Sequence, residues 1–553
     1  MRGLTALILF SLLSITVWAK PQQAAIASAH PLATQAGIEI LQQGGNAFDA
    51  AVAITAALAV VEPAGSGLGG GGFWLLHRAS DNFRVMVDGR EMAPGKAHAD
   101  MFLDEQGEFV PERSLNGPLA AGIPGVPAAL VHLNQHYGQL PLSASLQPAI
   151  RYAEEGFAVS EGFRRLARFR QDVMRTYPST AAIFLHEGDV PEPGHRIIQA
   201  ELANTLKALA QEGQPGFYQG AIAEKLVEAV QKNGGIWTMA DLASYEVKER
   251  EPLSGEYRGY QITSSALPSS GGTVLMLALN QLSGFDLTRA TQDQQRHWVI
   301  EVMRRAYRDR ARYLGDADFV TIPDYLTSIA YAEHIRADID DQLATPSQDL
   351  PSRDATGENT THFSVIDSAG NHVAATLSIN YPFGSGFVAE GTGVLLNDEM
   401  DDFSAQLGKA NAYGLIGNSA NAIAPFKRPM SSMSPTFIEN DDSLMITGTP
   451  GGSRIISMVL LSILDFVAGK TAREIVTTPR YHHQFSPDEV QIESTGFSAD
   501  DILALRERGH HIHQLNRRYG DMQTIIVDKR TGVVDVASDP RGEGLAAIVE
   551  IRP

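Results

Sequence analysis

The N-terminal third of the chain alternates between helical and strand-like spacing of its apolar residues. Two segments with apolar side chains at helical intervals come first, residues 24–43 and 50–61. Two short apolar runs with the length of strands follow, residues 73–76 and 85–88. The glycine-rich stretch 65–72 separates the two kinds of spacing. We therefore predict two helices, a glycine-rich connection and two strands.

The middle of the chain, residues 119–344, has a mostly helical pattern. Its clearest helices are predicted at residues 127–136, 201–211, 221–233 and 292–313. Residues 247–264 have the pattern of a strand, a turn and a second strand. The polar stretch 346–359 is expected to be exposed, and short strands then alternate with loops until a helix at 453–468. Helices and hairpins are intermingled without regular βαβ units, which favours one layered α+β body.

Residues 361–367 and 372–380 carry the signal of a β-hairpin, because two strand-like runs flank a short loop that contains glycine. A three-residue loop places Thr360 opposite Ser378, and a four-residue loop places it opposite Ile379. In both registers Ser378 lies beside Thr360.

The strand period also places Thr376, Ser378 and Asn380 on one face of the hairpin. Thr360 is a poor nucleophile inside a chain, but cleavage of the bond before it frees an α-amine that can act as its base. For the hairpin alone, an exposed polar face is the simpler interpretation. We assign Thr376 to the framework, and the motifs described below decide the role of the other residues.

Composition narrows the class of protein. The 553 residues include 44 Lys and Arg and 64 Asp and Glu, so the net charge is −20, which argues against a nucleic-acid or anionic-membrane partner. The chain has no cysteine, which excludes disulfides, thiolate zinc sites, iron–sulfur clusters and a cysteine nucleophile.

The first 19 residues have the pattern of a secretory signal peptide. Met1-Arg2 supplies a positive charge, residues 4–17 form a short apolar core, and small residues at positions 17 and 19 suit cleavage near Ala19. A membrane anchor is the alternative, but the apolar core is too short to span a bilayer well. We predict a periplasmic or secreted enzyme without a stable membrane anchor.

Several motifs accompany the hairpin in a fixed order. Downstream they occupy residues 395–403, 427–436, 447–454, 479–484 and 538–541, and upstream residues 44–51, 69–73 and 88–94. Together with Asn359-Thr360-Thr361-His362, they resemble the γ-glutamyltranspeptidase (glutathione hydrolase) family of N-terminal-nucleophile hydrolases. The resemblance extends over nearly the whole mature chain.

The resemblance implies a four-layer αββα sandwich built by two subunits of one precursor. Self-cleavage between Asn359 and Thr360 would give a large subunit, residues 20–359, and a small subunit, residues 360–553, which remain together as a heterodimer. It implies no cofactor and no metal. The implied substrates are small γ-glutamyl compounds such as glutathione.

The implied reaction passes through an ester of the nucleophile. Thr360 would attack the γ-glutamyl carbonyl, release the amine product and transfer the γ-glutamyl group to water or to an amino acid or peptide amine. Ser378 would orient the nucleophile. Gly451 and Gly452 match the oxyanion hole of the family, where glycine lets backbone N–H groups approach the carbonyl closely.

The remaining site residues are assigned by resemblance to the two ends of the glutamyl group. Those for the α-carboxylate are Arg90, Ser431 and Ser432, those for the α-ammonium are Asn380, Glu399 and Asp402, and Tyr413 matches a lid residue of bacterial members. The fork of an arginine guanidinium suits a carboxylate. Without the other motifs, residues 399–402 would more often be a solvated acidic turn.

Three alternatives remain open at this stage. One is the acylase branch of the same superfamily, which cleaves glutaryl-type side chains of cephalosporins. Another is a relative that processes γ-polyglutamate, and the third is a non-catalytic binding protein on this fold. Residues 65–70 fit a dinucleotide fingerprint, but a helix precedes them and a strand follows, which is the reverse of the required order.

Overall fold

The computed structural model describes residues 19–347 and 359–550. The predicted signal peptide, apart from Ala19, and residues 348–358 of the polar stretch lie outside the described residues. At the end of that stretch Asn359 is buried, with 4% of its surface exposed, so the expectation of exposure is wrong there.

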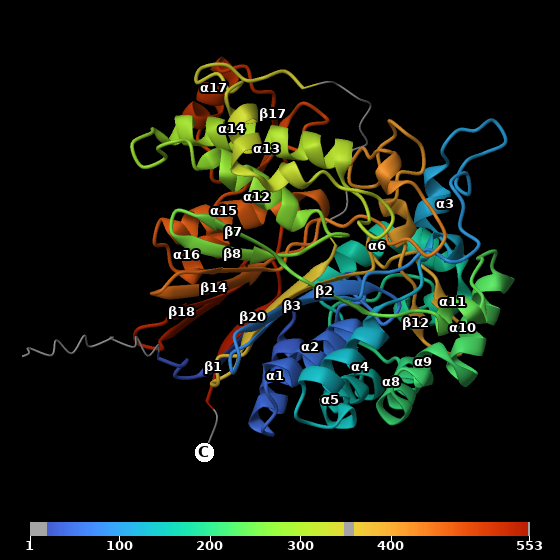
Figure 1. The fold of residues 1–553 in the computed structure, drawn as a ribbon. Coiled ribbons are helices and arrows are strands. Elements are labelled where there is room, and N and C mark those ends of the chain that lie inside the picture. The colour runs from blue at the N-terminus through green and yellow to red at the C-terminus, as the bar shows by residue number, and fades with distance from the viewer. Residues whose placement is uncertain (1–18, 348–358, 551–553) are drawn as a thin grey trace, which may run out of the picture.

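Two antiparallel sheets lie face to face in the centre of the molecule (Figure 1). The first has the strand order β20-β1-β9-β10-β2-β3-β6. Its strands are β1 (Ala24–Ser28), β2 (Gly71–Arg78), β3 (Phe83–Asp88), β6 (Lys248–Arg250), β9 (Thr361–Ile366), β10 (His372–Ser378) and β20 (Leu545–Val549). The second has the order β19-β18-β14-β13-β8-β7. Its strands are β7 (Leu253–Tyr257), β8 (Tyr260–Ser264), β13 (Thr436–Glu439), β14 (Ser443–Gly448), β18 (Gln523–Asp528) and β19 (Val534–Ser538).

Helices cover the outer face of each sheet (Figure 1). On the side of the first sheet lie α1 (Pro31–Gln42), α2 (Ala47–Val61), α4 (Val126–Tyr137), α5 (Leu142–Glu155) and α8 (Ala200–Glu212), of which α1 and α2 pack on its strands. On the side of the second lie α12 (Gly271–Leu282), α13 (Gln292–Tyr313), α14 (Ile329–Arg336), α15 (Ile455–Val467) and α16 (Ala472–Thr477), of which α12, α15 and α16 pack on its strands. The predicted four-layer αββα sandwich is confirmed.

The other elements lie around this sandwich. The helices are α3 (Pro111–Leu115), α6 (Glu161–Thr176), α7 (Pro178–Phe184), α9 (Pro215–Tyr218), α10 (Gly220–Lys232), α11 (Met239–Ala243) and α17 (Ala499–Glu507). The short strands are β4 (Phe157–Ala158), β5 (Arg196–Ile197), β11 (Val388–Ala389), β12 (Val394–Leu395), β15 (Tyr481–His482), β16 (Val490–Ile492) and β17 (Ile512–Gln514).

Successive side chains along each strand point to opposite faces of the sheet, and this divides the apolar core into two clusters. On β2, Trp74 and Leu76 join the cluster under the helices α1 and α2, whereas Phe73 and Leu75 join the cluster between the sheets. Both faces of the first sheet are therefore buried, and its strands are apolar at nearly every position. The two packed sheets hold the N-terminal end of β9, which Thr360 directly precedes.

The predicted helix at residues 24–43 is wrong in its first five residues. Ala24–Ser28 form the strand β1, which pairs with β20 on one side and β9 on the other. Small apolar residues suit a buried strand and a helix alike, so long-range pairing decides between them. The helix α13 and the hairpin of β9 and β10 follow the predicted pattern closely.

Candidate active site

The β9–β10 hairpin brings Thr360 next to Ser378. The register pairs Thr361 with Leu377, so Thr360 comes opposite Ser378, as the three-residue loop predicted. The two hydroxyl oxygens are 3.4 Å apart, and Thr360 is only 6% exposed. The Thr360 hydroxyl also contacts the carbonyl oxygen of Asn359. The hydroxyl is thus held beside the peptide bond that precedes its own residue.

A glycine turn lies between β14 and α15. Gly451 and Gly452 have φ angles of +141° and +58°, which L-residues with side chains seldom adopt. Within the described chain, no hydrogen bond engages the backbone N–H of either glycine. Such free N–H groups suit the stabilisation of a developing oxyanion.

Arg90 follows β3 and is surrounded by carboxylates. Its Nη1 atom is 2.7 Å from Glu399 and 3.5 Å from Glu91, and its Nη2 atom is 2.6 Å from Asp402. Nε donates to the carbonyl oxygen of Pro429 at 3.1 Å. Burial disfavours the charged guanidinium, but the three carboxylates outweigh it and hold the pKa of Arg90 above its ordinary value.

The acidic groups of this cluster are themselves destabilised by burial. Burial raises the pKa of Glu399 well above its usual range, with Arg90 opposing the shift. Burial likewise raises the pKa of Glu91 to about 8. The three carboxyl groups that contact Arg90 therefore outnumber the guanidinium that they share.

The two predicted serines line the same pocket. The Ser431 hydroxyl accepts a hydrogen bond from the backbone N–H of Met433 at 3.0 Å. The Ser432 hydroxyl accepts one from Nη2 of Arg310 at 3.1 Å. Arg310 is buried and also donates to Ser270. It was not predicted from the sequence, because it lies in the last turn of α13 without a recognisable motif.

Asn380 and Tyr413 close the pocket near the nucleophile. The backbone N–H of Asn380 donates to the Ser378 hydroxyl at 2.8 Å, and its side chain donates to the Asp398 carbonyl at 3.0 Å. The Tyr413 hydroxyl donates to the carbonyl oxygen of Asn380 at 2.6 Å. Tyr413 is 4% exposed, and its ring lies directly against Gly452. Tyr413 thus lines the pocket beside the glycine turn.

These side chains line one pocket, which we call the first pocket. Of the predicted residues, it is lined by Arg90, Thr360, Ser378, Asn380, Glu399, Asp402, Tyr413, Ser431, Ser432 and Gly452. Gly451 does not line it but forms the same turn as Gly452. Asn359 lines a different cavity, which also reaches Thr360. Glu91 was not predicted, although it directly follows Arg90 in the sequence.

Over residues 33–549 the sequence matches the γ-glutamyltranspeptidase family. The chain belongs to this family. It is 43% identical to the glutathione hydrolase proenzyme of Escherichia coli strain K12 over 532 residues, which cover 94% of this chain and 91% of that relative.

Solved structures agree with this assignment. The γ-glutamyltranspeptidase of Helicobacter pylori is 44% identical, with a TM-score of 0.56 and coverage of 58% of this chain and 92% of that one. The cephalosporin acylase of Bacillus halodurans is 30% identical, with a TM-score of 0.86 and coverage of 98% and 99%. The fold is that of the N-terminal-nucleophile hydrolases.

This γ-glutamyltranspeptidase family member is therefore a γ-glutamyl hydrolase and transferase, made as a proenzyme, processed to two subunits and acting on small substrates. The acylase alternative is less favoured. In residues 19–347 and 359–550, no helix has both the length and the apolar content to cross a membrane.

Proposed function

We propose that this γ-glutamyltranspeptidase cuts its own chain between Asn359 and Thr360 and then uses Thr360 as its nucleophile. The large subunit then comprises residues 20–359 and the small subunit residues 360–553. The signal-peptide pattern of residues 1–19 supports export to the periplasm or the medium. The relative from Escherichia coli is named a glutathione hydrolase. By analogy, the donor of this enzyme is glutathione or a related γ-glutamyl compound.

Self-cleavage begins with attack of the Thr360 hydroxyl on the Asn359 carbonyl, which it already contacts. The C–N bond of the peptide breaks as an ester forms, and water hydrolyses the ester. The freed α-amine of Thr360 has an ordinary pKa of about 7.7–8.0, so a useful fraction is neutral near pH 7 and can accept the proton of the hydroxyl.

In the mature enzyme Thr360 attacks the γ-glutamyl carbonyl and the amine product leaves. The oxyanion is stabilised by the backbone N–H groups of Gly451 and Gly452. Ser378, whose oxygen lies 3.4 Å from that of Thr360, fixes the direction of the nucleophile. Water or an amine then takes the acyl group and restores the hydroxyl.

The first pocket recognises both charges of the glutamyl group. Arg90 pairs with Glu399 and Asp402. A bound glutamyl group supplies an α-carboxylate for Arg90 and an α-ammonium for the two acids, so every buried charge keeps a partner of opposite sign. Ser431 and Ser432 lie beside Arg90 in the same lining and add hydroxyl donors.

One observation carries this proposal. A single pocket contains the Thr360 hydroxyl together with buried groups of both signs, as an α-amino acid requires. The purified protein should separate into two fragments under denaturing conditions, and the smaller should begin at Thr360. Thr360→Ala should remain one inactive chain. Release of glutamate from glutathione by an uncut wild-type chain would contradict the mechanism.

The donor class is tested with a pair of anilides. A γ-glutamyl anilide carries the α-ammonium, and the matching glutaryl anilide lacks it. We expect the γ-glutamyl anilide to react faster, because the glutaryl group leaves Glu399 and Asp402 without the cation. Equal rates would favour the acylase alternative, which the likeness to a cephalosporin acylase supports.

A further inference from the structure

Arg310 is a buried cation without an acidic partner in the described part of the chain. It lies in the last turn of α13, and only 3% of its surface is exposed. Its guanidinium forms no ion pair with a described carboxylate, and its hydrogen bonds go to two serine hydroxyls. Burial lowers the pKa of Arg310, which Tyr307 and Asp402 only partly oppose.

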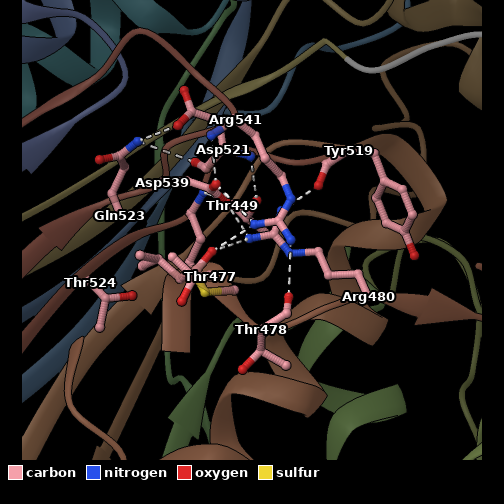
Figure 2. A network of polar contacts seen from close by, with 12 residues as sticks. Thr449, Thr477, Thr478, Arg480, Tyr519, Asp521, Gln523, Thr524, Asp539 and Arg541 are labelled. Atoms are coloured by element: carbon pink, nitrogen blue, oxygen red, sulfur yellow. Dashed lines mark hydrogen bonds and ion pairs between the residues drawn. The ribbon is translucent and has the colours of Figure 1, made fainter. Parts of the chain in front are cut away.

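Other arginines with buried side chains are paired with acids. Figure 2 shows two of them, Arg480 and Arg541, whose guanidinium groups both contact Asp539. A buried charge without a partner destabilises the folded chain, because the protein interior does not solvate it as water does. Arg310 differs from these two arginines, since no described carboxylate offsets the cost of its burial.

The guanidinium of Arg310 lies behind the two serines of the first pocket. Arg310 does not line this pocket, but its Nη2 atom donates to the hydroxyl of Ser432, which does, at 3.1 Å. Its Nε atom donates to the hydroxyl of Ser270 at 2.9 Å, and Ser270 donates to the carbonyl oxygen of Ser431 at 2.7 Å. One guanidinium therefore holds Ser432 directly and Ser431 through Ser270.

These contacts determine which part each serine hydroxyl plays. A guanidinium can only donate, so the Ser432 oxygen accepts from Arg310. The Ser431 oxygen accepts from the backbone N–H of Met433. Each hydroxyl has one proton of its own, and neither donates it to another described residue. Both protons are therefore available to an acceptor in the first pocket.

The inference rests on the proposed function, in which the α-carboxylate of the donor binds beside Arg90, Ser431 and Ser432. A single hydroxyl, that of Ser432, then separates this carboxylate from the guanidinium of Arg310. The hydrogen bond from Ser432 to the carboxylate is strengthened, because the same oxygen accepts from a cation. The negative charge of the carboxylate also offsets the charge of Arg310 in a site shielded from solvent.

We propose that Arg310 is a positioning residue for the α-carboxylate of the donor and makes the first pocket selective for that group. Arg90 makes the direct contact in the proposed function, whereas Arg310 acts through Ser432. It holds the Ser432 oxygen as an acceptor, so that the hydroxyl proton is left for the carboxylate, and it places a positive charge one hydroxyl away. A donor with a neutral carboxamide in place of the carboxylate gains much less from this arrangement.

The test compares two donors that differ only in this group. One is a γ-glutamyl anilide, and the other is the same anilide with its α-carboxylate converted to a carboxamide, which keeps the α-ammonium. The ratio of kcat/KM for the first donor to that for the second is the carboxylate preference. In Arg310→Gln this preference should fall at least about tenfold, the scale of one hydrogen bond to a charged group. An unchanged preference would overturn the proposal.

The carboxylate preference is a measurement that a merely structural role does not change. Both rates come from the same preparation, so a smaller amount of folded or cleaved protein lowers them equally and leaves their ratio unaltered. If Arg310→Gln lowers both rates by the same factor, Arg310 supports the fold only and the proposal is wrong.

Arg312 provides a matched control. It lies in the same last turn of α13, but its side chain is exposed. Arg312→Gln removes the same charge and should change the preference by less than about twofold, because solvent screens exposed charges. A fall as large as that in Arg310→Gln would indicate a general effect of net charge and would also overturn the proposal.

A double-mutant cycle tests whether Arg310 acts through Ser432. In a Ser432→Ala background the hydroxyl that links the guanidinium to the carboxylate is gone. The additional effect of Arg310→Gln on the preference should then shrink to about twofold. A full tenfold effect in that background would contradict the role of Ser432.

Arg310→Lys keeps the proposal testable if Arg310→Gln does not fold. Lysine retains the buried charge, but its ammonium cannot reproduce the fork that donates to Ser270 and Ser432 together. The preference should fall at least about threefold, which is half of the tenfold effect on a free-energy scale. A preference equal to that of the wild type would overturn the proposal. If the wild type itself does not prefer the carboxylate donor, the proposed function of the first pocket fails instead.

Discussion

Gly452→Ala tests whether Tyr413 and the glycine turn form one catalytic unit. An added Cβ atom would lie 2.2 Å from Cδ1 and 2.4 Å from Cε1 of the Tyr413 ring, far inside ordinary contact. The ring cannot easily yield, because its hydroxyl is bonded to the Asn380 carbonyl at 2.6 Å. Either Tyr413 leaves the site or the turn that carries the Gly452 N–H moves.

The expected loss can be worked out from two terms. The φ angle of +58° costs an alanine about 1–2 kcal/mol. A displaced oxyanion donor costs about 10²–10³ in kcat. Gly44 provides the matched control, since its φ is +89° and a Cβ there meets nothing within 4 Å. Gly44→Ala has a comparable backbone cost without the clash.

The assay is kcat/KM on a γ-glutamyl anilide, normalised to the amount of protein with Thr360 at its N-terminus. We expect Gly452→Ala to lose at least about 100-fold and Gly44→Ala to remain close to wild type. In a Tyr413→Ala background the clash is gone, so the additional effect of Gly452→Ala should shrink to about tenfold, because only the backbone strain at the turn that carries the N–H donor remains. An undiminished effect in that background would refute the reasoning.

Three further predictions follow from the geometry. Arg90→Lys should lower kcat/KM on γ-glutamyl anilide at least about tenfold, because one ammonium cannot replace a fork that contacts Glu399 and Asp402 together. Ser378→Ala should slow both self-cleavage, followed on denaturing gels, and turnover by about 10–100-fold, whereas Ser378→Thr keeps the hydroxyl and should retain both. Burial raises the pKa of Glu62 to about 7. The contribution of this side chain to the free energy of unfolding is therefore full below its pKa in the unfolded chain, near 4.5, and is lost as the pH rises through 7. This is tested by denaturant unfolding of the uncut Thr360→Ala protein, with and without Glu62→Gln, at about pH 4.5 and pH 8. Relative to the protein that keeps Glu62, the free energy of unfolding of the Glu62→Gln variant should be higher at pH 8 than at pH 4.5 by up to about 3 kcal/mol. A difference that does not change with pH would contradict this.

The hairpin of the nucleophile could be predicted because its determinants are local. Both registers that the sequence allowed placed Ser378 beside Thr360, and the structure has the one with a three-residue loop, in which the two residues are opposite each other. The layered α+β body likewise followed from the alternation of helical and strand-like segments. The strand at Ala24–Ser28 was missed because its pairing with β9 and β20 joins residues from opposite ends of the chain.

The charged part of the site could be found only through motifs. Arg90 and Glu399 are more than three hundred positions apart, and neither sequence segment shows that their side chains meet at 2.7 Å. Arg310 and Glu62 lie outside the sequence motifs that identify the other site residues. Arg310 lies in the last turn of α13. Glu62 directly follows α2, and the packing of α2 against β9 brings it near the nucleophile.

The electrostatics of the first pocket explain why its donor should carry two charges. The Arg90 guanidinium and its carboxylates are buried, and removing one partner from a buried pair costs about 3–5 kcal/mol. A donor with a carboxylate alone would occupy Arg90 and leave Glu399 and Asp402 without a cation. A zwitterionic donor exchanges partners without leaving any charge alone. The buried carboxylates beside Arg90 are thus a barrier to donors that lack the ammonium.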